Sequence, residues 1–179
     1  MKKVEKEDVL SSQKQVANQF QDLVDKTDME DNDDRKRTKN YFDWINKKTQ
    51  IIIDEKSFNP NDKIYDGVKR GSVVWVEFGF NIGAEFGGKH PAIVLRRTGS
   101  SVFVLPLSSQ KPSQIKPYHV KIEKVYGFKN LIRWTNVLKL KNVSLQRIDI
   151  NASIGNVKGE VLNEINEAIK NTHIFYGFI

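Results

Sequence analysis

Three runs of mostly apolar residues in the middle of the chain have the composition and length of buried β-strands. They are Ser72–Phe78, Pro91–Arg97 and Ser101–Leu107. Runs of this length that are rich in β-branched or aromatic residues and bounded by glycine or turn residues are typical of strands. Only Thr98–Ser100 separates the second run from the third, and these three residues favour a tight turn. The pattern therefore predicts three strands, of which the last two form a hairpin.

Shorter apolar stretches follow and predict further strands and a final helix. Tyr118–Glu123 and Leu131–Thr135 flank a short turn, so we expect them to pair. Val137–Leu140 and Val143–Ile148 would supply two more strands, closing the sheet into a small barrel with few exposed edges. In Asn156–Asn171 apolar residues recur at helical spacing, so we expect a helix that packs on the core.

The first part of the chain has apolar residues at the spacing of amphipathic helices. We expect two such helices, Glu7–Lys26 and Asp34–Gln50, separated by a polar, acidic stretch. The narrow apolar side of the first helix suits packing on its own domain or on a partner chain. The turn-rich segment Phe58–Gly67 then leads into the strands.

These patterns predict two parts and a mainly β fold (α+β). Residues 1–67 would form a helical N-terminal extension, and residues 68–179 a small β-barrel with a C-terminal helix. The apolar tail His173–Ile179 is unusual for a chain end, so we expect it to dock on the domain or on a second copy.

Composition narrows the class of protein. The sequence has no cysteine, so it can form neither a disulfide nor a thiolate metal site. Its charged amino terminus does not resemble a signal peptide, and no stretch approaches the roughly 18 apolar residues of a membrane span. We therefore expect a soluble, cytoplasmic protein.

The net charge of +7 is unevenly distributed. Residues 1–69 carry 14 Lys and Arg against 15 Asp and Glu, whereas residues 70–179 carry 15 against 7. The positive excess thus lies on the strand-rich part, as expected for a domain that meets a polyanion such as nucleic acid. Many basic domains bind no nucleic acid, so the charge alone does not decide this.

A glycine-rich loop, Phe80–His90, lies between the first two predicted strands. Gly83, Gly87 and Gly88 allow its backbone to approach a ligand closely. The segments RGSVVWVEFG, GAEFGGKHPAIVL, VLPLSSQ and PYHVKI, in this order, resemble the MazF/PemK family of toxin endoribonucleases. The resemblance covers about Lys69 to Asn171.

The resemblance implies a strongly bent barrel and the role of toxin in a type II toxin–antitoxin system. Members of the family cleave single-stranded RNA sequence-selectively and without a metal, by attack of the ribose 2′-hydroxyl on the adjacent phosphate. It also implies a homodimer, a cognate antitoxin as partner and DNA binding together with that antitoxin. No cofactor is expected. His90, His119 and His173 are scattered, without carboxylates at ligand spacing, so we expect no metal site.

His90 and Ser108 are the catalytic residues that the resemblance implies. His90 stands where the family commonly has arginine, and a histidine can act as acid or base but is only partly charged near neutral pH. Alternatively, His90 only begins a strand and faces solvent. Ser108 occupies the family's threonine or serine position after the third strand. Its hydroxyl can bond a phosphate oxygen, or it only satisfies its own turn.

A further segment of the family, glutamine, a branched apolar residue and arginine, falls on residues 136–138, where the arginine is missing. Arg97, Arg133 and Lys139 are nearby cations that could compensate, or they are solvated strand residues. Phe86 either stacks on a base or covers the underside of the loop. The residues expected to contact RNA are Glu85, Lys89, Arg97, Ser109, Gln110 and Asn136.

Two other functions stay open. The absence of arginine at the two family positions suits a non-catalytic RNA-binding or protein-binding module on the same barrel. A third possibility is inhibition of an enzyme such as DNA gyrase, as a relative of this fold does. The glycine-rich loop and the Ser108–Gln110 segment resemble the RNA-cleaving branch more closely.

Overall fold

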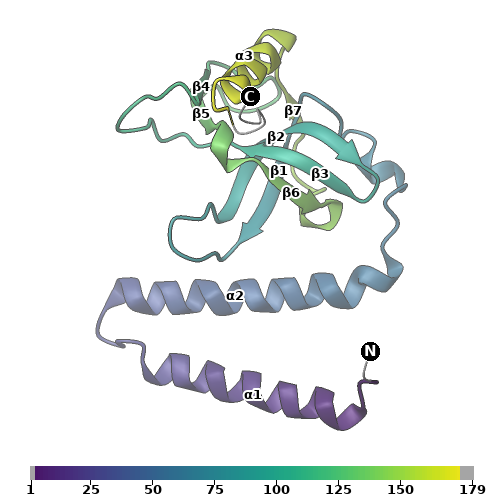
Figure 1. The fold of residues 1–179 in the computed structure, drawn as a ribbon, viewed down its shortest axis with the longest axis vertical. Helices are drawn as coiled ribbons and strands as arrows, with labels where there is room; N and C mark the ends of the chain where they lie inside the picture. The colour runs from purple at the N-terminus through teal and green to yellow at the C-terminus, as the bar shows by residue number, and fades with distance from the viewer. Residues whose placement is uncertain (1–2, 174–179) are drawn as a thin grey trace. The chain divides into compact units, whose positions relative to one another are not determined.

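The computed structural model describes residues 3–173, and the chain divides into two compact units between Gln50 and Ile51 (Figure 1). The first unit contains the helix α1 (Lys6–Asp25) and most of α2 (Asn32–Asp54). Both predicted helices are confirmed. The second helix continues four residues beyond the predicted end, into the second unit.

The two helices pack as an antiparallel hairpin near their connecting turn. The ring of Phe20 contacts Tyr41 and Phe42, with centroids 6.1 and 5.4 Å away. The hydroxyls of Thr27 and Thr38 are hydrogen-bonded at 2.8 Å. No residue of either helix is fully buried. The hairpin is therefore held by its turn end, and the other end of α1 is largely exposed.

The second unit is built on antiparallel strands. Five of them form one sheet in the order β6-β3-β2-β1-β7, and β4 pairs with β5 in a second, smaller sheet (Figure 1). The first three strands and the β4–β5 pair confirm the sequence predictions. The strands are β1 (Ser72–Gly79), β2 (Gly88–Thr98), β3 (Ser101–Pro106), β4 (His119–Ile122), β5 (Arg133–Asn136), β6 (Lys141–Ser144) and β7 (Gly155–Asn156).

The larger sheet curls back on itself after β6. A short 3-10 helix, η4 (Leu145–Arg147), returns the chain to β1, where Ile148 forms a bridge with Val76. The Asp149 backbone N–H donates to the Trp75 carbonyl at 2.9 Å. One apolar core fills the inside of this curl, with contributions from β1, β2, β3 and β6. The mainly β fold with a bent barrel is thus confirmed.

A second apolar core lies on the other face of the sheet. The helix α3 (Gly159–Lys170) and the β4–β5 sheet cover this face, and Ile93, Leu105, Ile122 and Ile165 are completely buried there. Because both faces are buried, β1, β2 and β3 read in the sequence as nearly continuous apolar runs.

Three sequence predictions are wrong in this region. Val137–Leu140 is not a strand but contains the 3-10 helix η3 (Val137–Lys139). Only the start of Val143–Ile148 is strand, because η4 follows. The C-terminal helix begins three residues later than predicted, since Asn156 belongs to β7. The tail that we expected to dock lies, apart from its first residue, outside the described residues. Within residues 3–173, no helix is both long and apolar enough to cross a membrane.

Candidate functional site

Asn81 and the loop's own backbone hold the glycine-rich loop between β1 and β2 in shape. The Asn81 side-chain amide donates to the carbonyl oxygens of Phe86, at 2.6 Å, and Phe78, at 3.3 Å. A Cβ atom on Gly87 would lie 2.7 Å from the Gly79 carbonyl oxygen, a separation that side chains do not tolerate. The loop therefore places the Phe86 ring edge-on against Phe78, with centroids 5.2 Å apart.

Phe86 forms one wall of a cavity of about 140 Å³ beyond the end of β3, which we call the site cavity. The backbones of Ser108 and Trp134 exchange hydrogen bonds of 2.9 and 2.8 Å, which fix the segment after β3 beside β5. Phe86, Pro106, Pro112 and Trp134 form the apolar walls. The polar groups come from Ser108, Gln110, His119, Thr135, Asn136 and Lys139.

Ser108 is the predicted catalytic residue that the structure places in this cavity. Its Oγ accepts a hydrogen bond from the Gln110 backbone N–H at 3.0 Å. The hydroxyl proton remains available to a ligand, because accepting this bond does not use it. Gln110 and Asn136, predicted to contact RNA, line the same cavity. Three of the eight predicted site residues therefore meet here.

His119 is a functional candidate that sequence reasoning did not select. It lies on β4 directly opposite Asn136 on β5, and its Nδ1 accepts a hydrogen bond from the Lys116 backbone N–H at 3.0 Å. A neutral imidazole whose Nδ1 is an acceptor carries its proton on Nε2. His119 can therefore donate a hydrogen bond from Nε2.

Lys139 is the only Lys or Arg among the described residues that line the cavity. Its Nζ donates to the Ala84 carbonyl oxygen at 2.7 Å, which ties η3 to the glycine-rich loop. Arg133, considered above as a compensating cation, is instead buried on β5. It donates to the carbonyl oxygens of Lys129 and Leu131 at 3.4 and 3.0 Å. Positive charge at the site thus comes from Lys139.

Thr135 contributes a buried hydroxyl to the cavity wall. The residue is 2% exposed, and its Oγ1 has no hydrogen-bond partner among the described residues. The neighbouring Asn136 uses its Oδ1 to accept from the Leu138 backbone N–H at 2.9 Å, which leaves its amide N–H groups available. The wall formed by β5 therefore has unused hydrogen-bonding capacity.

His90 does not line the cavity, but its ring contacts Phe86 at a centroid distance of 4.7 Å. It lies on β2, opposite Val76 of β1, and is partly buried, so it does not simply face solvent. Burial lowers the pKa of His90, although a hydrogen bond with the Leu107 backbone and the charge of Glu77 oppose the change. The imidazole is therefore neutral at neutral pH and cannot replace the positive charge of an arginine.

The other predicted RNA contacts lie outside the cavity. Lys89 forms an ion pair with Asp149 at 2.6 Å, which lowers the pKa of that carboxyl. Glu85 and Ser109 are exposed neighbours of lining residues. Arg97 donates to the carbonyl oxygens of Pro60 and Tyr65 and therefore has a structural role.

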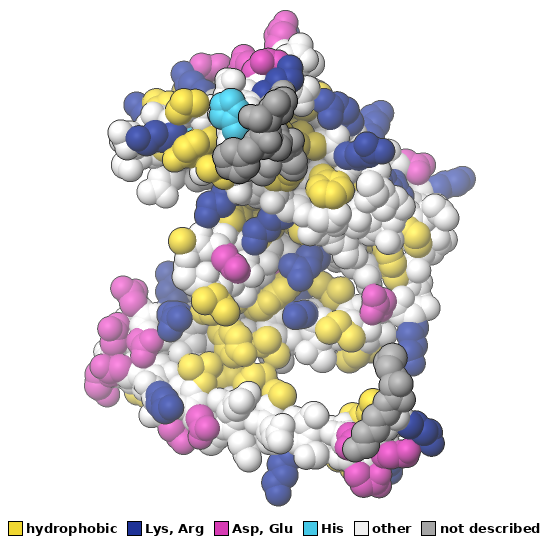
Figure 2. Space-filling view, in the orientation of Figure 1, with side chains coloured by type: hydrophobic (Ala, Val, Ile, Leu, Met, Phe, Trp, Pro, Cys, Tyr) yellow, Lys and Arg dark blue, Asp and Glu magenta, His cyan; other side chains and the backbone are white. Residues whose placement is uncertain are grey.

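The charge of the second unit and its potential metal ligands indicate which kinds of ligand the site could bind. The second unit carries 18 of the chain's 29 Lys and Arg but only 11 of its 22 Asp and Glu, and cationic side chains occur over much of the barrel face in Figure 2. Among the described residues, no group of three His, Asp or Glu is close enough to hold a metal ion.

Comparison with known proteins assigns the class of protein. Residues 69–173 match the family described as PemK-like, MazF-like toxin of type II toxin–antitoxin system. Because this match covers more than half of the sequence, the chain belongs to that family. A comparison with curated proteins gives no match.

Several solved structures are similar to this chain at low sequence identity. An endoribonuclease in complex with its cognate antitoxin, from a mycobacterial species, is 16% identical, with a TM-score of 0.44, over 62% of this chain and 98% of that one. MazF from Deinococcus radiodurans is 19% identical, with a TM-score of 0.47, over 58% and 94%. Toxin MazF-mt6 from Mycobacterium tuberculosis is 16% identical, with a TM-score of 0.43, over 57% and 94%.

Proposed function

We propose that this toxin-family protein is an endoribonuclease that cleaves single-stranded RNA in the site cavity, without a metal ion. The observation that carries the proposal is the meeting of Ser108, His119, Asn136 and Lys139 in one cavity on the basic unit. Ser108 supplies a hydroxyl donor, His119 an imidazole donor, Asn136 an amide and Lys139 a cation. A single ligand in the cavity could reach all four groups. A phosphodiester needs such donors and a positive charge.

The reaction would be attack of a ribose 2′-hydroxyl on the adjacent phosphorus. The 2′-oxygen forms a bond to phosphorus, the bond from phosphorus to the 5′-oxygen breaks, and a proton moves from the first oxygen to the second. Ser108 Oγ–H and His119 Nε2–H would donate to the phosphate oxygens. Lys139 would release the Ala84 carbonyl and balance the charge that develops on phosphorus.

His90 is our candidate for the base that accepts the 2′-hydroxyl proton. Its lowered pKa keeps one ring nitrogen unprotonated at neutral pH, as a base requires. Because Phe86 lines the cavity and contacts His90, the substrate must displace the Phe86 ring to reach it. The flat faces of Phe86 and Trp134 would then stack on unpaired bases, and Gln110 and Asn136 would contact base edges.

The proposed biological role is that of a toxin acting as a homodimer, held inactive by a cognate antitoxin and binding DNA together with it. Family membership supports this proposal, and the related mycobacterial endoribonuclease was solved with its antitoxin. Induced expression of this chain alone should arrest growth of the host cell.

The test of the enzymatic proposal is cleavage of a labelled single-stranded RNA by the purified full-length chain in excess EDTA. Cutting should continue in EDTA, stop when the ribose at the cut site is replaced by 2′-deoxyribose, and leave a 2′,3′-cyclic phosphate. Ser108→Ala and His119→Ala should each lower the rate about 100-fold, the usual size of acid–base effects. Ser113→Ala is the matched control, because Ser113 is exposed, does not line the cavity and is not among the expected RNA contacts. Complete loss of cutting in EDTA would contradict metal independence.

A second candidate function is RNA binding without cleavage. The observation that favours it is the absence of arginine from the described cavity walls, together with the use of Lys139 Nζ in the bond to Ala84. In that case the wild-type chain would shift RNA in a gel but would leave it intact under all conditions. Ser108→Ala would then change affinity by only a few-fold.

A further inference from the structure

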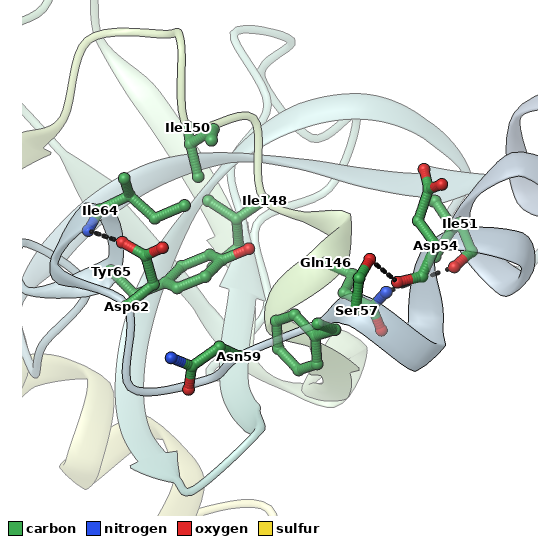
Figure 3. Close-up of a pocket in the computed structure, with 11 residues that line it drawn as sticks. Ile51, Asp54, Ser57, Asn59, Asp62, Ile64, Tyr65, Gln146, Ile148 and Ile150 are labelled. Atoms are coloured by element: carbon green, nitrogen blue, oxygen red, sulfur yellow. Dashed lines mark hydrogen bonds between the residues drawn. The ribbon is translucent and has the colours of Figure 1, made fainter.

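A second pocket, of about 340 Å³, lies within the second unit and shares no residue with the site cavity (Figure 3). Residues 51–65 form one side of it and residues 146–150 the other. We call it the linker pocket, because residues 51–65 link α2 to the barrel. Its volume is within the usual range for ligand pockets, roughly 300–1,000 Å³.

Hydrogen bonds from side chains of the barrel fix the backbone of the linker pocket. The Arg97 guanidinium donates to the Tyr65 carbonyl oxygen at 2.9 Å and to that of Pro60. The side-chain amide of Gln146 donates to the Ile51 carbonyl oxygen at 3.3 Å. The Arg97 bonds fix residues 60–65 to β2, and the Gln146 bond joins the two sides of the pocket, so its shape is held before any ligand arrives.

Part of the pocket wall is apolar and open to solvent. Ile64 and Ile150 are 48% and 42% exposed, and in Figure 3 their side chains lie near the Tyr65 ring together with Ile148. Exposed aliphatic groups around a preformed concavity are the usual contact surface for an apolar stem.

The charged side chains among the described lining residues of the pocket are both carboxylates. The carboxylates of Asp54 and Asp62 line it, and no Lys or Arg is among its described lining residues. This is the reverse of the charge balance of the unit as a whole, which has an excess of seven positive charges. The guanidinium of Arg97 is bonded to the backbone carbonyls of Pro60 and Tyr65, so the carboxylate of Asp62 favours a cation over a polyanion such as RNA.

Asp62 and Tyr65 offer specific contacts to such a cation. One carboxylate oxygen of Asp62 accepts from the Ile64 backbone N–H at 3.0 Å, which leaves the other oxygen available. The Tyr65 hydroxyl makes no hydrogen bond within residues 3–173. Burial and the nearby charge of Asp62 raise the pKa of Tyr65, so the phenol stays protonated.

We propose that the linker pocket binds an arginine or lysine side chain of a partner peptide, with neighbouring apolar residues of that peptide on Ile64 and Ile150. The aliphatic stem would lie on the isoleucines and the charged end would reach Asp62. A peptide suits the pocket better than a free amine, because Ile64 and Ile150 are both exposed and can contact apolar residues on either side of the charged one. Peptide binding in the linker pocket would not require RNA cleavage in the site cavity, because the two share no lining residue.

The alternative is that Asp62 only caps the short helix η2 (Lys63–Tyr65). Asp62→Asn separates the two roles, because asparagine caps a helix as well as aspartate but carries no charge. Asp66→Asn is the matched control, since Asp66 is an exposed carboxylate four residues away that does not line the pocket. Tyr65→Phe removes only the hydroxyl.

The probe is the acetylated peptide Leu-Arg-Ile-amide, titrated into the full-length chain and followed by amide chemical shifts. Shifts should map to Ile64, Ile148 and Ile150. The affinity should fall about tenfold in Asp62→Asn, and by the same factor when glutamine replaces arginine in the peptide, as for loss of a charged hydrogen bond. Asp66→Asn should bind like the wild type.

Three results would overturn the proposal. The first is unchanged binding to Asp62→Asn with an unchanged melting temperature. The second is equal binding of the glutamine peptide. The third is equal binding of agmatine, a free guanidinium on an alkyl chain, because it would show that the apolar neighbours contribute nothing. If Asp62→Asn failed to fold, Tyr65→Phe and the two control ligands would still decide.

Discussion

The surroundings of His90 determine its protonation state and therefore which chemical role it could have. Its ring lies against Phe86 in a partly buried position, and burial lowers its pKa from the ordinary value of 6.5. A neutral imidazole cannot hold the charge of a phosphorane as an arginine would, but it can accept a proton. In the proposed mechanism, the two roles of one arginine would therefore be divided between a base at His90 and a cation at Lys139.

The same pKa shift predicts how stability depends on pH. Between the lowered pKa of folded His90 and 6.5, the unfolded chain binds more protons at this residue than the folded chain does. The free energy of unfolding should therefore fall as the pH drops below 6.5, until the folded state is protonated too. Thermal melts at several pH values between 5 and 8 measure this loss.

His90→Gln is the comparison that isolates this contribution. Glutamine can still donate to the Leu107 carbonyl but does not titrate, so the variant should lose less stability on acidification than the wild type. Contributions from other groups cancel in the difference between the two proteins. Parallel pH profiles for the two proteins would show that His90 is not the source.

At the scale of elements, the sequence predicted those strands whose pattern is set by burial. β1, β2 and β3 are covered on both faces, so their apolar runs mark them directly. The misassigned segments are also apolar, but side chains redirect their backbones. Asn136 accepts from the Leu138 N–H and Ser144 from the Gln146 N–H, at 2.9 and 3.2 Å, and each starts a 3-10 turn.

The site was predictable only in part for a related reason. Ser108, Gln110 and Asn136, which line the site cavity, were predicted from the family resemblance. His119 was not, because its place in the cavity depends on the bridge between Ser108 and Trp134, which joins two sheets. A local pattern shows that His119 and Lys121 face away from Val120 and Ile122 but cannot show what they face.

β7 is the shortest strand and depends on a glycine. A Cβ atom on Gly155 would lie 2.8 Å from the Tyr126 carbonyl oxygen and 2.7 Å from the Phe128 ring. Gly155→Ala should therefore lower the free energy of unfolding by roughly 1–3 kcal/mol, the usual cost of overpacking. Urea denaturation measures this change.

Gly159→Ala is the control for that substitution. Nothing lies within 4 Å of its added Cβ atom, and Gly159 begins α3, where alanine favours the helix. The control should be neutral or slightly stabilising. If Gly155→Ala were equally well tolerated, the contact between β7 and the segment 125–128 would be looser than the structure indicates.

At the scale of the whole molecule, the linker belongs to the barrel. The predicted extension ended at residue 67, whereas the compact units meet between Gln50 and Ile51. Tyr65 is 7% exposed and lies in the barrel core, and Phe58 packs against that core. Removing the helical hairpin and removing the whole predicted extension are therefore different experiments.

Deletion of residues 1–50 should leave a folded barrel that keeps most of its RNA affinity, because the entire net charge of +7 lies beyond residue 50. Deletion of residues 1–67 also removes Tyr65 and the carbonyl acceptors of Arg97. The free energy of unfolding of this shorter chain should be about 3–5 kcal/mol lower than that of the chain without residues 1–50, as for loss of a large buried aromatic side chain. Urea denaturation and RNA binding at fixed salt measure both effects.

Tyr65→Ala in the full-length chain is the matched variant, and it should reproduce most of the difference in stability between the two deletions. Equal stability of the deletions would contradict the packing of the linker on the barrel. A third outcome bears on the hairpin. If the chain without residues 1–50 melted normally but no longer bound RNA, the hairpin would be the RNA-binding element, and the site cavity would have to be assigned to another ligand.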